Sequence, residues 1–334
     1  MKLLALLILF SALYGWHVAT SPFVYEDMHL VGADRHVSWA GALQPRGLTT
    51  ESWVLIQSPQ ASHALNVSLH LVVVGLVGLL LWRITRDAFA AHAGALIMAF
   101  HPLTGETVAY AASRSELIAA VGAILVLVCA VSPSPWTWGV IPPAFALAYM
   151  GKETGLVAIG LVPLVLWMQG ERRWAWRLTA LVCSVVVVIA LWRWPALQAL
   201  SHHGEYGDLR VSPGAWVATQ TAAVGRLALL SMAPIWLSVS PAVEPLPGYA
   251  AMAALILACG LVECVWRLSS VAPLAAGGIV GCAIVAAPRF VVRTPGSPFN
   301  EHQWYVAMPF VACVLVAGLQ ACETWWQTMR AEVT

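Results

Sequence analysis

Long apolar runs separated by short polar stretches dominate the sequence. A helix that crosses a bilayer needs about 20 mostly apolar residues, and many of the runs approach this length. The pattern therefore predicts an all-α polytopic membrane protein with about 10–11 transmembrane or membrane-embedded helices. The apolar runs cover residues 3–20, 63–82, 88–101, 115–131, 136–150, 154–169, 177–195, 216–238, 249–266, 271–288 and 304–322.

Two of these runs need a separate interpretation. The run 3–20 has the features of either a signal peptide or a first spanning helix, and we favour an uncleaved helix because the rest of the chain is polytopic. The run 216–238 contains Arg226 and Pro234, so it is the best candidate for a helix that lies along the membrane instead of crossing it.

The composition places the chain in the same class. Hydrophobic residues make up 60% and charged residues 10%, whereas soluble domains are about 45–50% apolar and about 25% charged. A net charge of +1 gives no electrostatic footprint for nucleic acid, so none is expected as a partner. We expect a single transmembrane domain over residues 1–334 and no soluble domain.

Basic residues in short connections predict the orientation. Arg83 and Arg86 lie in one connection and Arg172 and Arg173 in another, and alternating helices place both on one side, with Lys2. This side is cytoplasmic by the positive-inside rule. The protein would be a multi-pass protein of a bacterial inner or plasma membrane with an extracytoplasmic active face. That outer side receives a long first loop, 21–62, in which Trp39 and Trp53 are expected to be interface anchors.

Five clusters of polar residues interrupt the apolar pattern on the predicted outer side. Ionisable groups near membrane depth are costly, so they are functional candidates. The clusters are Glu26, Asp27 and His29; His63, Asn66 and His70; His101, Glu106, Arg114 and Glu116; Lys152 and Glu153; and Arg289, Arg293, Glu301, His302 and Tyr305.

Each cluster also has a purely structural interpretation. His63, Asn66 and His70 share one helix face, which we expect to point into the bundle and to hydrogen-bond between helices. The third cluster flanks a predicted surface turn, where salt bridges in a solvated loop would account for it. Lys152 and Glu153 would pair at a helix end, and the carboxylates of the first cluster would lie in a plain interfacial loop.

The shared location suggests one chemistry. Adjacent carboxylates can act as a general base for an acceptor hydroxyl, and several cations can hold a phosphate leaving group. A polyprenyl-phosphate sugar needs this combination, because its lipid lies in the bilayer while its phosphate and sugar lie at the membrane surface.

The order of the motifs resembles that of the integral-membrane glycosyltransferases of the GT-C fold. The resemblance is closest to the transmembrane and tetratricopeptide-repeat O-mannosyltransferases and their bacterial relatives, without the repeat domain. Glu26 stands where the family has Asp, and His302 stands where it has Arg. The motifs are FVYEDMHLV (23–31), RGLT (46–49), HALNVSLH (63–70), HP followed by Glu106, Arg114 and Glu116, then GKETG (151–155) and EHQWYVAMP (301–309).

The resemblance implies inverting transfer of a mannose-like hexose to an acceptor hydroxyl. Asp27, with Glu26 beside it, would be the base, and Glu106 would orient the acceptor or Asp27. The donor phosphate would be held by Lys152, Arg114, Arg289, Arg293 and His302. A structural or acceptor-orienting role falls to His63, Asn66, His70, His101, Glu153 and Tyr305.

The expected partners are the lipid-linked sugar donor, membrane lipid and an acceptor that is a protein or a glycan. No metal site is predicted, although a divalent cation could bind at Glu26 and Asp27. Two alternatives stay open. The chain could be a non-catalytic membrane subunit on the same scaffold, as the departures at Glu26 and His302 suggest. It could also be a transporter of lipid-linked sugars, but this predicts ionisable residues near the bilayer midplane instead of near helix ends.

Overall fold

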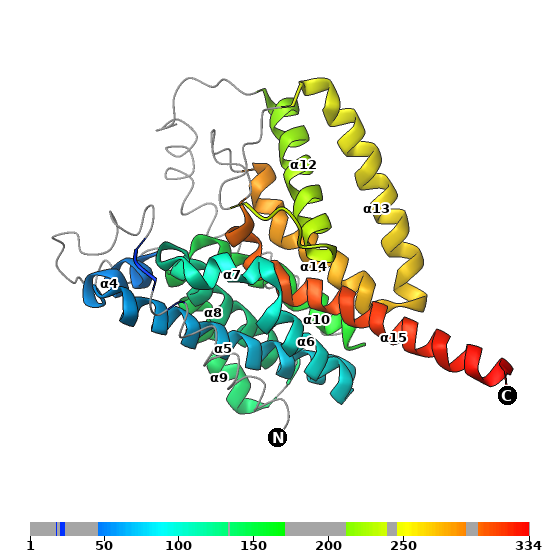
Figure 1. Cartoon of the computed structure of the whole chain (residues 1–334), viewed down its shortest axis with the longest axis horizontal. Helices are drawn as coiled ribbons and strands as arrows, with labels where there is room; N and C mark the ends of the chain where they lie inside the picture. The colour runs from blue at the N-terminus through cyan, green and yellow to red at the C-terminus, as the bar shows by residue number, and fades with distance from the viewer. Residues whose placement is uncertain are drawn as a thin grey trace.

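The computed structural model describes residues 18, 21–23, 46–132, 134–170, 212–238, 246–291 and 300–333. In this part of the chain the secondary structure is all helical, which confirms the all-α prediction (Figure 1). The helices are α4 (Gly47–Leu55), α5 (Pro59–Thr85), α6 (Ala88–Phe100), α7 (Pro102–Ala109), η1 (Ala111–Ser113), α8 (Arg114–Ala130), α9 (Pro135–Gly151), η2 (Glu153–Val157), α10 (Ala158–Met168), α12 (Pro213–Met232), η3 (Gly248–Ala250), α13 (Ala251–Val271), α14 (Pro273–Val291), η4 (Glu301–Ala307) and α15 (Met308–Val333).

The predicted apolar ranges overlap helices, although α12 ends at Met232 within the range 216–238. The range 177–195, and the range 3–20 apart from Val18, lie outside the described residues. Among the described residues, five helical stretches are long and apolar enough to cross a membrane. They are Pro59–Thr85, Ala111–Ala130, Gly248–Val271, Pro273–Phe290 and Glu301–Glu332. Two short helices, α4 and α7, form where loops were expected.

Serine caps followed by proline start several of these helices. The Ser58 hydroxyl accepts a hydrogen bond from the Ala61 amide, 3.2 Å away, and Ser212 caps α12 in the same way. Ser134 forms a capping box at the start of α9. Proline follows each serine at the first helical position, where its missing N–H leaves no donor unpaired.

Helix α8 lies at the centre of the bundle, where 89% of its apolar window is buried. It packs closely against α9 because small residues face each other. A Cβ atom added to Gly122 would lie 2.4 Å from the Ala148 amide nitrogen. At Gly151 the added atom would lie 2.6 Å from the Ala119 nitrogen. Small residues bring membrane helices together in this way.

Helix α13 is the opposite case, since only 6% of its apolar window is buried. Figure 1 shows it at the periphery of the structure, beside α12. Its exposed side chains are large and apolar, among them Ile256 at 66% and Val262 at 70% exposure. An exposed apolar helix of this length is expected to face lipid.

The bundle has two ends that differ in chemistry. At the end where α5, α8 and α10 finish, the Gln169 side chain donates hydrogen bonds to the Arg83 and Val131 carbonyls, 3.4 and 3.0 Å away. Gln320 of α15 donates to Asp87 Oδ2 at 2.8 Å. We call this the arginine end. We call the other end, where α5 and α8 begin, the polar end.

Helix α12 packs over the polar end. Its Trp216 indole donates to the Arg289 carbonyl at 3.0 Å, and its Arg226 pairs with Glu301 at 2.7 Å. The α12 helix is not one of the five stretches that meet the length and composition of a membrane span. The interpretation of 216–238 as a helix that lies along the membrane stays a prediction.

Candidate functional site at the polar end

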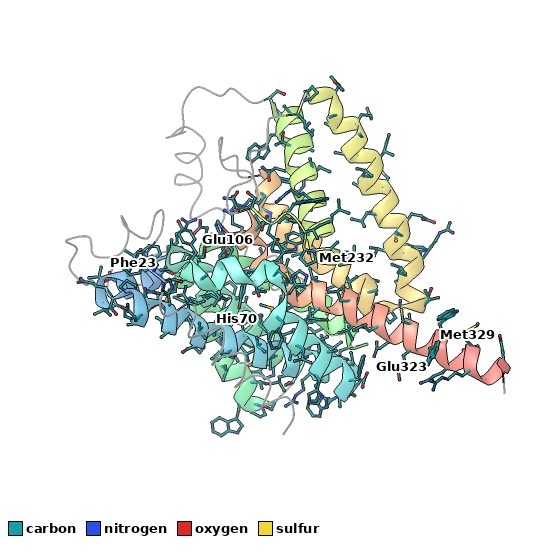
Figure 2. The ribbon with its side chains drawn as sticks, in the orientation of Figure 1. Phe23, His70, Glu106, Met232, Glu323 and Met329 are labelled. Carbon is teal, nitrogen blue, oxygen red and sulfur yellow. The ribbon has the colours of Figure 1, made fainter. Side chains whose placement is uncertain are left out.

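Glu106 and His302 form a hydrogen-bonded pair between α7 and η4. The His302 Nδ1–H donates to Glu106 Oε1 at 3.0 Å, and the two side chains are only 12% and 17% exposed. The Tyr110 and His302 rings meet in a T-shaped contact, with ring centroids 6.4 Å apart. The second carboxylate oxygen, Glu106 Oε2, is buried and has no hydrogen-bond partner in the described part of the chain. Figure 2 labels Glu106 and His70, which lie at separate places in this view.

Lys152 and Glu116 form a buried ion pair between the end of α9 and the first turn of α8. Lys152 Nζ lies 2.5 Å from Glu116 Oε1, and the side chains are 6% and 1% exposed. Burying either charge alone would be strongly unfavourable, so each residue accounts for the burial of the other. Glu116 Oε2 is also buried without a hydrogen-bond partner among the described residues.

A second, more exposed pair lies next to this one. Arg46, which precedes α4, donates two hydrogen bonds to the Glu153 carboxylate, at 2.9 and 2.6 Å. Burial raises the pKa of Glu153, but the hydrogen bond and charge of Arg46 outweigh burial and hold this pKa below its usual value. Arg289 of α14 lies within electrostatic range of this pair and of Glu116. Four segments of the chain therefore bring charges together here.

Arg114 is fully buried and is surrounded by hydrogen-bond acceptors. Its Nε donates to Asn66 Oδ1 at 3.0 Å and its Nη1 to Ser52 Oγ at 2.9 Å. Its Nη2 contacts both the hydroxyl and the carbonyl of Ser62. The expectation of a surface turn at Arg114 and Glu116 was wrong, because α8 begins inside the bundle and these acceptors replace water.

The predicted face of α5 does point into the bundle, since His63, Asn66 and His70 are at most 1% exposed. The Asn66 amide donates to the Val108 and Tyr110 carbonyls, 3.3 and 3.1 Å away, and thereby holds the connection between α7 and α8.

His70 lies deeper in the bundle, where Nε2 approaches the Ala99 carbonyl at 3.5 Å. A carbonyl can only accept, so Nε2 carries the proton, and Nδ1 accepts from the Tyr305 hydroxyl at 2.6 Å.

His101 joins α6, α7 and α12. Its Nδ1 accepts from the Leu103 amide at 3.3 Å, so its Nε2 carries the proton and donates to the Ser231 carbonyl at 3.1 Å. Burial lowers the pKa of His101, and the bond to Ser231 opposes burial only in part. The neutral imidazole is therefore favoured. The Ser231 hydroxyl also accepts from the Trp304 indole at 3.0 Å.

Several residues at this end were missed or misread in the sequence. Glu301 Oε1 accepts from Arg226 at 2.7 Å and from the Ser238 amide at 2.8 Å, an arrangement that only the packing of α12 on η4 creates. The signal for Arg226 was its charge within an apolar run. Trp53 was expected to anchor at the interface, but it is buried, and its indole donates to the Ala111 carbonyl at 3.2 Å.

Other predicted residues lie outside the described part of the chain, namely Glu26, Asp27, His29, Trp39 and Arg293. Within the described residues, no group of three or more His, Cys, Asp or Glu side chains is arranged to hold a metal ion.

Comparison of the chain with protein-family models, with curated proteins and with solved structures found no match.

Proposed function

We propose that this chain is a glycosyltransferase of the GT-C type that uses a polyprenyl-phosphate sugar and transfers a mannose-like hexose, with inversion, to an acceptor hydroxyl. One observation carries the proposal. Motif residues from distant segments gather at one end of an apolar helical bundle, where carboxylates and cations lie close together. A lipid-linked donor needs this arrangement, because its phosphate must be held at the end of a membrane-embedded protein.

In this proposal Glu106 orients the acceptor. One of its oxygens accepts from His302, which holds the carboxylate in place, while Oε2 has no protein partner among the described residues. That oxygen can accept the hydrogen of an acceptor hydroxyl. Asp27, with Glu26 beside it, keeps the role of general base that the family resemblance implies.

The donor phosphate is assigned to the cationic cluster, which we define as Arg46, Glu116, Lys152, Glu153 and Arg289. It brings three cations and two carboxylates together from four segments of the chain. Cations positioned beside a departing phosphate stabilise the charge that it develops. Arg114 contributes indirectly, by holding α8 through Ser52, Ser62 and Asn66.

The arginines support an extracytoplasmic position for the polar end. Arg83 and Arg86 follow α5, while Arg267 lies near the end of α13 and Arg330 near the end of α15. All four belong to the arginine end, and under the positive-inside rule that end would face the cytoplasm.

The test is a transfer assay with purified protein, a labelled polyprenyl-phosphate mannose and a hydroxyl acceptor. The proposal expects label on the acceptor with inverted anomeric configuration, and loss of transfer in Asp27→Asn. Full activity in that variant would sink the role of Asp27, and absence of any transfer to protein or glycan acceptors would count against the enzyme assignment.

A second candidate is a non-catalytic membrane subunit on this scaffold. The observation that favours it is that buried and partly buried cations pair within the protein. Lys152 is bonded to Glu116, the partly buried Arg226 to Glu301, and Arg114 to its three neighbours on α4 and α5. Co-purification in a stable complex, together with absence of transferase activity, would distinguish this function from the first.

A further inference from the structure

Two arginines at the arginine end stack on the same tryptophan. The guanidinium carbons of Arg83 and Arg86 each lie 5.3 Å from the centre of the Trp82 ring, which is 40% exposed. Among the described residues, neither arginine has a carboxylate within 4.0 Å. Arg83 Nε is buried without a hydrogen-bond partner in the same part of the chain. Within the described residues, the site therefore carries two cations with no carboxylate paired to them.

The backbone at Arg86 has an unusual conformation. Arg86 ends α5 in the left-handed conformation, with φ of 57°, a position that glycine usually occupies. This conformation is unfavourable for a residue with a Cβ. Arg86 therefore occupies a backbone position that favours glycine, and its side chain contributes the second cation over Trp82.

An exposed apolar stripe leads from the arginines along α5. Val72, Gly75, Leu79 and Trp82 are all exposed, and their spacing of three and four residues places them on one face of the helix with Arg86. No atom lies within 4 Å of a Cβ added to Gly75, so the stripe is open there. The face combines an apolar track, an indole and two guanidinium groups in this order.

We propose that Trp82, Arg83 and Arg86 bind the phosphate headgroup of an anionic phospholipid, whose acyl chain lies along the α5 stripe. Arginine pairs with phosphate through its fork of N–H donors, and indoles prefer the membrane–water interface. The α5 stripe favours a phospholipid over a soluble phosphate, because only the phospholipid has an acyl chain to lie along it. This site is separate from the polar end and does not depend on the proposed transfer reaction.

The test measures lipid binding by native mass spectrometry of the purified protein in detergent, with phosphatidylglycerol and phosphatidylcholine as probes. We expect preferential binding of phosphatidylglycerol, and a loss of about fivefold in affinity for each arginine removed. The variants are Arg83→Gln and Arg86→Gly. The second also relieves the left-handed backbone, so its melting temperature should not fall, and weaker lipid binding could not be ascribed to misfolding.

The matched control is Arg267→Gln, which removes an exposed arginine that already pairs with Glu263 at 2.6 Å. It should leave the preference for phosphatidylglycerol unchanged. Unchanged lipid binding in the double variant at positions 83 and 86 would overturn the proposal. Displacement of phosphatidylglycerol by soluble glycerol phosphate at equal concentration would also overturn it, since the site would then recognise free phosphate alone.

Discussion

The cations at the two ends of the bundle have different kinds of neighbours. At the polar end Lys152 and Arg114 are buried and Arg226 is partly buried, and each lies against protein acceptors. At the arginine end Arg83 and Arg86 rest on the Trp82 ring and have no acidic partner among the described residues. A buried charge must be neutralised within the protein, whereas a charge at the interface can be neutralised by water and lipid headgroups.

This difference suggests that the polar end is suited to positioning a substrate and the arginine end to contact with the membrane. The polar end holds its side chains in fixed geometry through bonds between distant segments, as a site that positions a substrate requires. The arginine end presents cations and indoles outward, as membrane contact requires.

The buried pair of the polar end gives the largest expected effect. Lys152→Met leaves the Glu116 carboxylate without its cation in an apolar environment, and we expect a loss of about 3–5 kcal/mol in the free energy of unfolding. Thermal unfolding in detergent measures it. The control is the double variant Lys152→Met with Glu116→Gln, which removes both charges and should recover most of the stability. An unchanged melting temperature in the single variant would contradict the burial of the pair.

The Glu106–His302 pair is expected to affect transfer activity more than stability. Glu106→Gln keeps the size of the side chain and an acceptor for His302 but removes the negative charge. We expect transfer to fall by about 10²-fold, in the range for a positioned acid or base, with little change in melting temperature. Glu263→Gln, at an exposed position on α13, should retain wild-type activity. Equal activity of the two variants would show that Glu106 has no part in transfer.

The hydrogen bond between His70 and Tyr305 is expected to stabilise the packing beneath the polar end. Tyr305→Phe removes the hydroxyl that donates to His70 Nδ1 and leaves this buried nitrogen without that donor. We expect a loss of about 1–3 kcal/mol of stability. Tyr249→Phe removes a hydroxyl from a side chain that is exposed, so it should have no effect. A similar loss in both variants would mean that the hydrogen bond to His70 does not stabilise the folded protein.

The exposed pair of Arg46 and Glu153 should have the smallest effect. Water screens it, so Glu153→Gln is expected to lower stability by less than about 1 kcal/mol. Because the pKa of Glu153 is lowered in the folded protein, its contribution is present above the ordinary value of 4.5 and is lost as the pH falls through the lower folded value. Unfolding measured between neutral and acidic pH should show the wild type and the variant converge in acid. A gap that persists there would point to another cause.

Sequence reasoning predicted much of this molecule correctly. The apolar runs located the helices, because a helix in lipid must be apolar over its whole length. The spacing of His63, Asn66 and His70 predicted one inward face, and all three are buried. The first cluster, with Glu26 and Asp27, stays a prediction.

Other features could not be read from neighbouring residues. Arg114 and Glu116 were placed on a surface turn because their polarity suggests solvent, but their partners come from other helices. Trp53 was placed at the interface, where indoles often lie, but the Ala111 carbonyl and the buried start of α8 decide otherwise.

The sequence by itself determined that this is a membrane protein and that it is helical. It also determined the positions at which polar groups interrupt the apolar helices. Those properties depend on local composition and periodicity. Only the tertiary structure decided which charges meet: Glu116 with Lys152, Glu106 with His302 and Arg226 with Glu301. The reason is physical, because a buried charge is tolerated only beside its partner, and that partner is brought by packing from a distant part of the chain.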